Sequence, residues 1–363
     1  MASFDVVLKD CTKLGTKIPT SEYLENGKYP IIDQGQNDIA GYYDSDDGLF
    51  EDVPAIVFGD HTRVVKYVDK PCFLGADGVK LLCPVDKDIN CKYLFYQLSC
   101  ADIPNTGYNR HFKWVKALDF KIPSSDEQNH VVEVLDKVTD LIFLRKQQLA
   151  KLDELVKARF VEMFGTFPAN PFRWSTGKIQ DVVSDVRYGS SRPAVEGGKY
   201  PYLRMNNITY SGELDLHDTK RIDIPDSELD KCTVRRGDVL FNRTNSKELV
   251  GKTCVYNRDE LMVLAGFVIR VRVNERIRPE VLSAFLNMDF SKRMLIGMCK
   301  TAIGQANINA KELQNIDLYI PPIELQDQFV TLKNKIDQQK QTVQQSLEKL
   351  ELMKKALMQE YFG

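Results

Sequence analysis

Two stretches of this chain read alike: "KIPSSDEQNHVVEVLDKV" at residues 121–138 and "YIPPIELQDQFVTLKNKI" at residues 319–336. Ile122-Pro123 near the start of the first copy matches Ile320-Pro321, 198 positions later. Each copy continues beyond the quoted stretch to a Phe-Gly pair, at 164–165 and at 362–363, and these pairs are also 198 positions apart. No gap is needed between these anchors, so one segment is present twice in constant register. A repeat of this kind indicates two halves built on a common framework.

The segments upstream of each copy align only loosely. The tetrapeptide "GKYP" occurs at 27–30 and again at 198–201, which is 171 positions later, and "AIVFGDHT" (55–62) resembles "DVLFNRT" (238–244). The chain therefore keeps one framework segment twice and varies the module in front of it.

Each copy of the framework segment is predicted to be one long helix. In the first copy, Ser125 and Gln128 form a capping box after Pro123, and Gly165 stands where a helix C-cap glycine belongs. The helix between them, 126–164, would be about 58 Å long at about 1.5 Å per residue. A helix of this length requires a packing partner.

Seam residues in both copies are spaced alternately three and four apart, the heptad pattern of a coiled coil. The apolar seam positions are Leu135, Val138, Ile142, Leu149, Leu152 and Val156 in the first copy and Ile336, Val343, Leu347, Leu350 and Leu357 in the second. The seam also contains the basic residues Arg145, Arg159, Lys340 and Lys354, whose long side chains can carry their charge outward. We therefore expect the two copies to form an antiparallel coiled coil; the alternative is that each helix packs separately on its own domain.

Antiparallel pairing would place the two modules at opposite ends of the helix pair, related by an approximate two-fold axis. Such an arrangement matches two half-sites on duplex DNA, as in dimeric DNA-binding proteins.

The modules combine short apolar runs with polar, Gly-rich turns, a composition typical of strands. The expected strands include 55–59, 63–68, 78–84, 238–243 and 266–273, and short helices are expected at 92–100 and 279–295. The predicted fold class is α+β, with modules at 1–120 and 166–318 and framework helices within 121–165 and 319–363, related by a pseudo-two-fold internal repeat.

Bulk composition narrows the classes of function. The 363 residues are 43% hydrophobic and 28% charged with a net charge of −2, so a DNA-binding face would have to be a local patch. No apolar run approaches the ~18 residues of a membrane-spanning helix and the N-terminus lacks a signal peptide, so a cytoplasmic location is expected. The eight cysteines form no C-x-x-C pair and the four histidines are dispersed, which favours reduced thiols and no metal site.

Over its full length the chain resembles the DNA specificity (S) subunits of type I restriction-modification systems. The resemblance rests on the two-half layout and on "RYGSSRP…GGKYPYLRMNNIT" (187–209), "RRGDVLFNRTNS" (235–246) and "AIGQANINAKELQNIDLYIPPIELQDQF" (302–329). The first half departs from the pattern, because "KIPSSDEQ" (121–128) lacks the second proline and "TGYNRHFKW" (106–114) replaces "AIGQANINA". Contact residues therefore carry over less directly to the first module.

The resemblance implies that the modules are target-recognition domains, each reading one part of a split target in double-stranded DNA. It also implies a subunit with no catalytic activity and no cofactor of its own. Two modification (methyltransferase) subunits, which methylate adenine with S-adenosylmethionine, would dock on it, and restriction (nuclease/translocase) subunits could join them.

Catalytic motifs in the sequence are weak. The stretches "FLGADG" (73–78), "NPF" (170–172) and "DFK" (119–121) share only fragments with methyltransferase or nuclease motifs, and no GxGxxG or GxxxxGK[ST] occurs. We therefore expect a protein that is not an enzyme.

Polar loops supply the candidate DNA-reading residues, since Arg pairs with guanine and Asn with adenine through two hydrogen bonds each. In the second module they are Arg187, Tyr188, Ser190, Ser191, Arg192, Arg204, Asn206, Asn207, Arg243, Thr244, Asn245, Ser246 and Lys247. In the first module they are His61, Arg63, Lys66, Asn109, Arg110 and Lys113. Gln305 and Asn307 in "GQANIN" (304–309) either contact DNA or hold a turn, and for each of the others a solvated turn is the alternative.

These patterns predict a DNA specificity subunit. Two alternatives stay open: a protein–protein adaptor that binds through its coiled coil, and a specificity subunit of a type II-like methyltransferase/nuclease complex.

Overall fold

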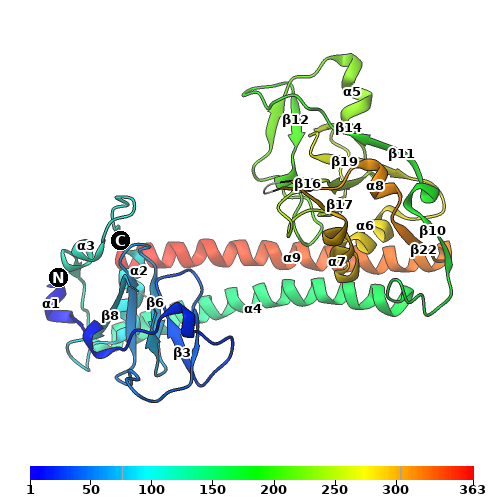
Figure 1. Cartoon of the computed structure of the whole chain (residues 1–363). Coiled ribbons are helices and arrows are strands. Elements are labelled where there is room, and N and C mark those ends of the chain that lie inside the picture. The colour runs from blue at the N-terminus through cyan, green and yellow to red at the C-terminus, as the bar shows by residue number, and fades with distance from the viewer. Residues whose placement is uncertain (76, 303–304) are drawn as a thin grey trace. The chain divides into compact units, whose positions relative to one another are not determined.

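The computed structural model describes residues 1–75, 77–302 and 305–363, and the side chains of residues 300–305 lie outside that description. The chain divides into two compact units. Unit 1 comprises Met1–Lys146 and Gln345–Gly363, and unit 2 comprises Gln147–Gln344. The elements of each unit can be followed by label and chain colour in Figure 1.

Two 40-residue helices, α4 (Ser125–Phe164) and α9 (Ile323–Phe362), confirm the expected long helices. Gly165 follows α4 with a φ of +84°, the left-handed conformation predicted for a C-cap glycine. Because α4 and α9 each cross from one unit to the other, every unit holds half of each helix.

The start of α4 differs from the expectation. Ser124 rather than Ser125 caps the helix, since its Oγ accepts a hydrogen bond from the Glu127 N–H at 3.3 Å. The predicted Ser125–Gln128 capping box is therefore wrong. Gln128 is turned toward the module instead, where its Oε1 accepts from the Asn90 N–H at 2.9 Å.

Within each unit, the parts of α4 and α9 that belong to it run antiparallel. Leu135 shares a core cluster with Leu357 and Lys146 pairs with Glu351 in unit 1, while Asp153 pairs with Lys340 and Phe160 contacts Phe329 in unit 2. Residues later in α4 thus meet residues earlier in α9, as antiparallel pairing of the two copies requires.

The eleven apolar seam residues are all buried or half-buried. Near the end of α4 the buried face shifts: Phe160 is 1% exposed and packs on Phe329, whereas Arg159 is exposed and pairs with Glu162 of its own helix. The predicted seam position of Arg159 is therefore wrong. A straight helix of 3.6 residues per turn drifts by ~20° per heptad from a 3.5-residue repeat, which moves Phe160 into the seam.

The module of unit 1 contains a four-stranded sheet, order β2-β8-β5-β6, a three-stranded sheet, order β4-β3-β7, and the ribbon β1-β9. Its strands are β1 Ala2–Ser3, β2 Leu8–Asp10, β3 Tyr29–Ile32, β4 Gly41–Tyr43, β5 Ala55–Gly59, β6 Val65–Val68, β7 Phe73–Leu74, β8 Val79–Pro84 and β9 Asp119–Phe120. Its short helices are α1 Phe4–Val7, α2 Cys91–Cys100 and α3 Phe112–Lys116, with 3-10 turns η1 Thr12–Leu14 and η2 Thr20–Glu22.

The module of unit 2 contains the sheets β11-β19-β15-β17 and β13-β12-β18-β14, the ribbon β10-β22 and the three-stranded sheet β16-β21-β20. Its strands are β10 Ser175–Lys178, β11 Val183–Tyr188, β12 Tyr200–Leu203, β13 Lys220–Ile222, β14 Thr233–Val234, β15 Val239–Asn242, β16 Thr244–Asn245, β17 Thr253–Val255, β18 Met262–Leu264, β19 Val268–Val273, β20 Lys300–Ala302, β21 Gln305–Asn307 and β22 Asp317–Ile320. Its short helices are α5 Asp226–Cys232, α6 Pro279–Asn287, α7 Asp289–Met298 and α8 Ala310–Gln314, with η3 Ile179–Val182 and η4 Met205–Asn207. The single helix expected at 279–295 is thus two helices that meet at Met288.

The two modules share the strand order of their larger sheet, while the second sheet has three strands in unit 1 and four in unit 2. The sheet β2-β8-β5-β6 corresponds to β11-β19-β15-β17, and each second sheet contains one parallel pair, β3 with β7 and β12 with β18. The two "GKYP" stretches run into β3 and β12, and α8 starts 198 positions after α3. The repeat therefore extends through the modules, because strand order depends on backbone pairing and apolar alternation rather than on identical residues.

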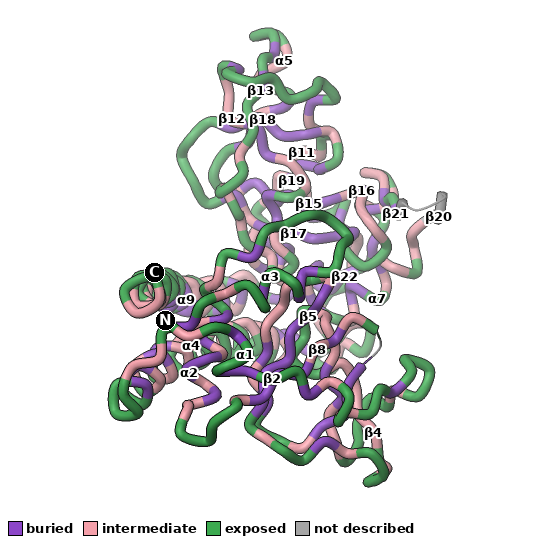
Figure 2. The backbone as a smooth tube through the Cα atoms, turned by 90° about the vertical axis from the view of Figure 1, so that its left-hand side faces the viewer, coloured by how far each residue is buried: buried purple, intermediate pink, exposed green. Residues whose placement is uncertain are grey.

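The central strands of the larger sheets carry the cores. All five residues of β5 and all four of β15 are buried. Figure 2, coloured by burial, shows such buried stretches within the sheets and green exposed loops at their ends. Within the described part of the chain, helices long enough to cross a bilayer are too polar to do so.

Candidate nucleic-acid interface

In each unit, a loop leaves the central strand of the larger sheet and meets the segment in front of the framework helix. In unit 1, loop 60–64 follows β5 and meets segment 102–111. In unit 2, loop 243–252 follows β15 and meets segment 305–309. Since β5 and β15 are buried throughout, the first accessible polar side chains along each strand lie in these loops.

Asp60 joins the two parts of the surface in unit 1. Its carbonyl accepts from the His111 N–H at 2.8 Å and lies 2.9 Å from His111 Nδ1, and its carboxylate accepts from the Phe112 N–H at 2.7 Å. Asp60 and His111 are 3% and 0% exposed. This buried group of bonds holds loop 60–64 against the segment before α3.

An aromatic stack lies on the surface above these bonds. The rings of His61 and Tyr108 are parallel, with 4.7 Å between centroids and 9° between planes, and His61 Nδ1 is 3.2 Å from the Asn109 carbonyl. Asn109, Arg110 and Lys113 are exposed beside Tyr108 in the chain. The arrangement presents a flat ring together with donors for bases or phosphates.

Arg243 has the corresponding position in unit 2. Its carbonyl accepts from the Ile308 N–H at 2.9 Å, and its guanidinium lies 4.9 Å from the centre of the Tyr188 ring. The Tyr188 Oη accepts from the Ala310 N–H at 2.8 Å. The Arg243 Nε is buried without a hydrogen-bond partner among the described residues, so no hydrogen bond at this atom competes with the contact to Tyr188.

The loop after Arg243 combines half-buried and exposed donors. Asn245 and Ser246 are half-buried, and the Asn245 Oδ1 accepts from the Ser246 N–H at 2.9 Å, while Lys247 is exposed. Asn307, on the facing strand β21, is exposed as well. Gln305 also belongs to β21, but its side chain lies outside the described residues.

Four candidates lie inside the modules and hold turns or strands. They are Lys66, Ser190, Asn207 and Thr244, at 6%, 4%, 2% and 8% exposed. Lys66 donates to the Asp33 carboxylate at 3.2 Å, and Asn207 accepts from the Arg204 N–H at 2.9 Å. The structure thus gives these four side chains a place inside the module, and their contact with DNA stays a prediction.

Four candidate arginines already have partners in their own unit. Arg63 donates to the Ile103 carbonyl at 3.0 Å, and Arg187, Arg192 and Arg204 pair with Asp185, Glu228 and Asp218 at 2.8, 2.7 and 2.8 Å. The hydrogen bond from Arg192 lowers the pKa of Glu228, and that from Arg204 lowers the pKa of Asp218. These carboxylates stay charged at neutral pH, so a DNA phosphate would have to replace them as the partners of the arginines. Surface ion pairs contribute little to stability, so this replacement costs little free energy.

The remaining two candidate DNA-reading residues, Ser191 and Asn206, are exposed. The candidate set omitted two exposed aromatic residues that lie at the same loops, Tyr108 at 88% and Phe267 at 54% exposed. The Phe267 carbonyl accepts from the Arg243 N–H at 3.0 Å. Both rings directly follow a glycine, Gly107 and Gly266, a signal that could have identified them.

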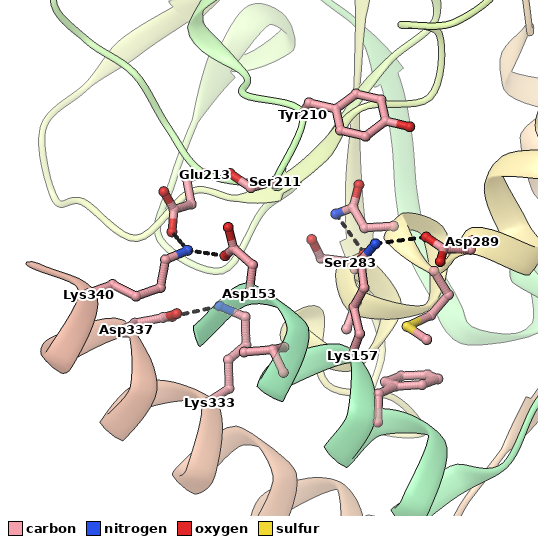
Figure 3. Close-up of a pocket in the computed structure, with 16 residues that line it drawn as sticks. Asp153, Lys157, Tyr210, Ser211, Glu213, Ser283, Asp289, Lys333, Asp337 and Lys340 are labelled. Atoms are coloured by element: carbon pink, nitrogen blue, oxygen red, sulfur yellow. Dashed lines mark hydrogen bonds and ion pairs between the residues drawn. The ribbon is translucent and has the colours of Figure 1, made fainter. Parts of the chain in front are cut away.

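A pocket of about 200 Å³ lies in unit 2 between α4, α9, the α6–α7 corner and the loop at Tyr210–Glu213 (Figure 3). The Lys340 ammonium sits between Asp153, at 2.5 Å, and Glu213, so this seam lysine is buried rather than turned outward. Burial acts to lower the pKa of Lys340, but its two carboxylate partners outweigh that effect and raise it. The ion pairs thus tie the loop to the helices.

The lysines that line this pocket are paired with carboxylates. Lys333 pairs with Asp337 at 2.6 Å and Lys157 with Asp289 at 2.7 Å, and the described lining of the pocket includes neither His nor Cys. Across residues 1–75, 77–302 and 305–363, no group of three or more His, Cys, Asp or Glu side chains is placed to hold a metal ion.

Comparison with known proteins places these features in context. Residues 5–154 and 171–352 match the family described as Type I restriction modification DNA specificity domain. The chain is 23% identical over 229 residues to the type I restriction enzyme EcoKI specificity subunit of Escherichia coli K12, a match to 59% of this chain and 49% of that protein. It is 20% identical over 350 residues to the EcoR124I/EcoR124II specificity subunit of Escherichia coli, 88% of this chain and 82% of that protein. The chain thus spans about half the length of the first relative.

Solved structures share the fold over nearly the whole chain. The crystal structure of a type I restriction-modification S subunit from M. genitalium superposes with a TM-score of 0.58 at 16% identity, and the match covers 99% of this chain and 95% of that chain. At this identity the likeness concerns the fold alone.

Proposed function

The chain belongs to the type I restriction modification DNA specificity family, and on that basis we propose that it is a sequence-specific DNA-binding subunit that reads a target in two parts. Each module reads one part of double-stranded DNA in the cytoplasm. The chain performs no chemistry itself and sets the target for partner subunits.

One observation carries this proposal: the two modules share the strand order of their larger sheet and a loop position but present different side chains there. His61 stacks on Tyr108 after β5, and Arg243 stacks on Tyr188 after β15. Two copies of one framework with unlike surface residues suit two different short sequences. Arginine and asparagine beside each other, as at Arg243 and Asn245, supply donors and acceptors for guanine and adenine edges.

The framework helices offer a surface for the partners. On the part of α4 in unit 1, Leu141, Phe143 and Leu144 are 43%, 59% and 55% exposed, and on α9 Leu352 and Met353 are 68% and 51% exposed. Large apolar side chains exposed along these helices are available for contact with another protein. We assign these stretches of α4 and α9 to contact with two modification subunits, which would bring S-adenosylmethionine, with restriction subunits joining the complex.

Mapping of methylated positions tests the function. The chain is expressed with its methyltransferase subunits in a host without the system, and sequencing of modified bases should give one motif with two defined parts and unspecified bases between them. Replacing residues 1–120 with the corresponding module of a relative should change one part only.

Two outcomes contradict the proposal. One is a single undivided motif. The other is a stable complex that methylates nothing and shifts no duplex from a mixed pool in a gel-shift assay, which would favour a protein–protein adaptor.

A further inference from the structure

Residues 105–116 of unit 1, "NTGYNRHFKWVK", interleave aromatic and basic side chains. The segment holds three Lys or Arg residues and no Asp or Glu, in a chain whose net charge is −2. Tyr108 and Trp114 are 88% and 36% exposed, and Arg110 and Lys113 are exposed as well. Accessible aromatic rings on a basic surface are typical of proteins that bind unpaired nucleotides, where bases stack on the rings and cations meet the phosphates.

Tyr108 leaves most of its ring accessible. His61 lies parallel to one ring face, with the rings 4.7 Å apart and 9° from parallel, and Tyr108 stays 88% exposed. The preceding Gly107 has a φ of +77°, and a Cβ added there would meet no atom of the described residues within 4 Å, so the loop tip is open on that side. A planar, uncovered ring suits a planar ligand better than it suits an irregular protein surface.

The stack is held in place before any ligand arrives. The His61 N–H donates to the Gln34 Oε1 at 3.2 Å, and the Asn109 Nδ2 donates to the Thr106 carbonyl at 2.5 Å within the same loop. The buried Asp60 bonds described above fix the base of the loop. Little ordering is therefore needed when a base stacks on Tyr108, which favours binding.

We propose that the Tyr108–His61 stack is a binding site for a single nucleobase that has left the duplex stack, with Arg110 and Lys113 against the flanking phosphates. This inference rests on the proposed DNA-binding function and adds to it a site for an unstacked base. It assigns to unit 1 a preference for DNA that is bulged, kinked or opened at one position.

Fluorescence anisotropy with the full chain tests the site. The probes are a labelled duplex with one unpaired thymine and the same duplex without it. The wild type should bind the bulged duplex about tenfold more tightly, the range expected for stacking one base on an aromatic ring. Tyr108→Phe should keep this preference, and Tyr108→Ala should reduce the ratio of the two affinities to less than about twofold, because the bulged duplex loses more binding than the perfect one.

Tyr210→Ala is the matched control, because Tyr210 is a 57% exposed tyrosine of unit 2 outside the basic segment, and it should keep the preference. Equal binding of the two duplexes by the wild type, or a preference that survives Tyr108→Ala, overturns the inference and leaves the proposed function intact. If Tyr108→Ala no longer binds its partner subunits but still prefers the bulged duplex, the Tyr108 ring contacts a protein rather than a base. If the wild type binds neither duplex even with its partner subunits, both proposals fail.

Discussion

Arg243 joins two parts of the candidate interface. Its guanidinium lies over the Tyr188 ring, and its backbone joins β15 to the segment before α8. Arg243→Ala and Asn245→Ala should weaken recognition of one half of the target only, by about 1–3 kcal/mol for each lost base contact. Arg243→Lys should weaken recognition of the same half of the target, because lysine lacks the planar guanidinium that can stack on a ring and donate two hydrogen bonds to one base.

Methylation-site mapping measures this effect for each variant. Arg236→Ala is the control, because Arg236 is an exposed arginine of the same unit that pairs with Asp259 at 2.7 Å. Identical methylated sites in wild type and Arg243→Ala would show that the reading loop is elsewhere.

Lys292 is a buried lysine whose positive charge opposes folding. It is 8% exposed, and its Nζ donates to the Gly251 carbonyl at 2.6 Å. Burial first, and then the positive charges of Lys157 and Lys252, lower its pKa from 10.5 to about 7. Between these values the unfolded chain binds the proton and the folded chain does not, so this group makes stability rise with pH from about 7 to about 10.

Lys292→Met should therefore stabilise the protein most at pH 7 and below, by up to a few kcal/mol, with the gain shrinking toward pH ~10. Thermal unfolding of variant and wild type across this range measures the difference. Lys247→Met, at an exposed lysine of the same unit, should show no such trend. A stability difference that stays constant with pH would mean that Lys292 keeps its proton in the folded protein.

Among the elements, the framework helices are joined to the modules by one repeated glutamine. The Gln326 Oε1 accepts from the Arg278 N–H at 2.8 Å, and its Nε2 donates to the Arg276 and Pro321 carbonyls at 3.0 and 2.8 Å. Gln128 repeats the pattern in unit 1, accepting from the Asn90 N–H and donating to a proline carbonyl. Arg278 and Asn90 each precede a module helix, α6 or α2, so the glutamine ties that helix to the framework.

Gln326→Leu should lower the free energy of unfolding by about 3 kcal/mol or more, because it leaves three backbone groups without partners at a buried site. Urea unfolding measures the loss. Gln338→Leu on the exposed face of α9 is the matched control and should change stability little. A loss no larger than that of the control would mean that water or a shifted backbone satisfies these groups.

At the same scale, the sequence predicted what is periodic and missed what depends on tertiary contacts. The long helices were predictable because one spacing persists over 40 residues in two copies. The sequence could not distinguish Ser124 from Ser125 as the residue that caps α4, because the two adjacent serines have the same side chain. Ser190 and Ser191 look alike in one polar turn, yet only Ser190 is buried, and that follows from its pairing with Leu264 rather than from local composition.

For the whole molecule, the two long helices are the segments that both units share. The boundary between units falls after Lys146 in α4 and after Gln344 in α9. One heptad inserted at both points keeps every seam residue in phase and adds about 10 Å of paired helix. The gap between the two parts of the target should then widen by at least one base pair and by up to about three, at about 3.4 Å per pair.

Mapping of methylated sites before and after the insertion measures the gap. A heptad inserted in α4 alone is the matched control: it leaves seven residues of one helix without a partner, so it should destabilise the protein and abolish methylation rather than shift the motif. If the double insertion methylates efficiently with the original gap, the spacing of the half-sites is set by something other than the framework helices. If the gap widens while both half-sequences stay the same, the helices determine spacing and the modules determine sequence, independently of each other.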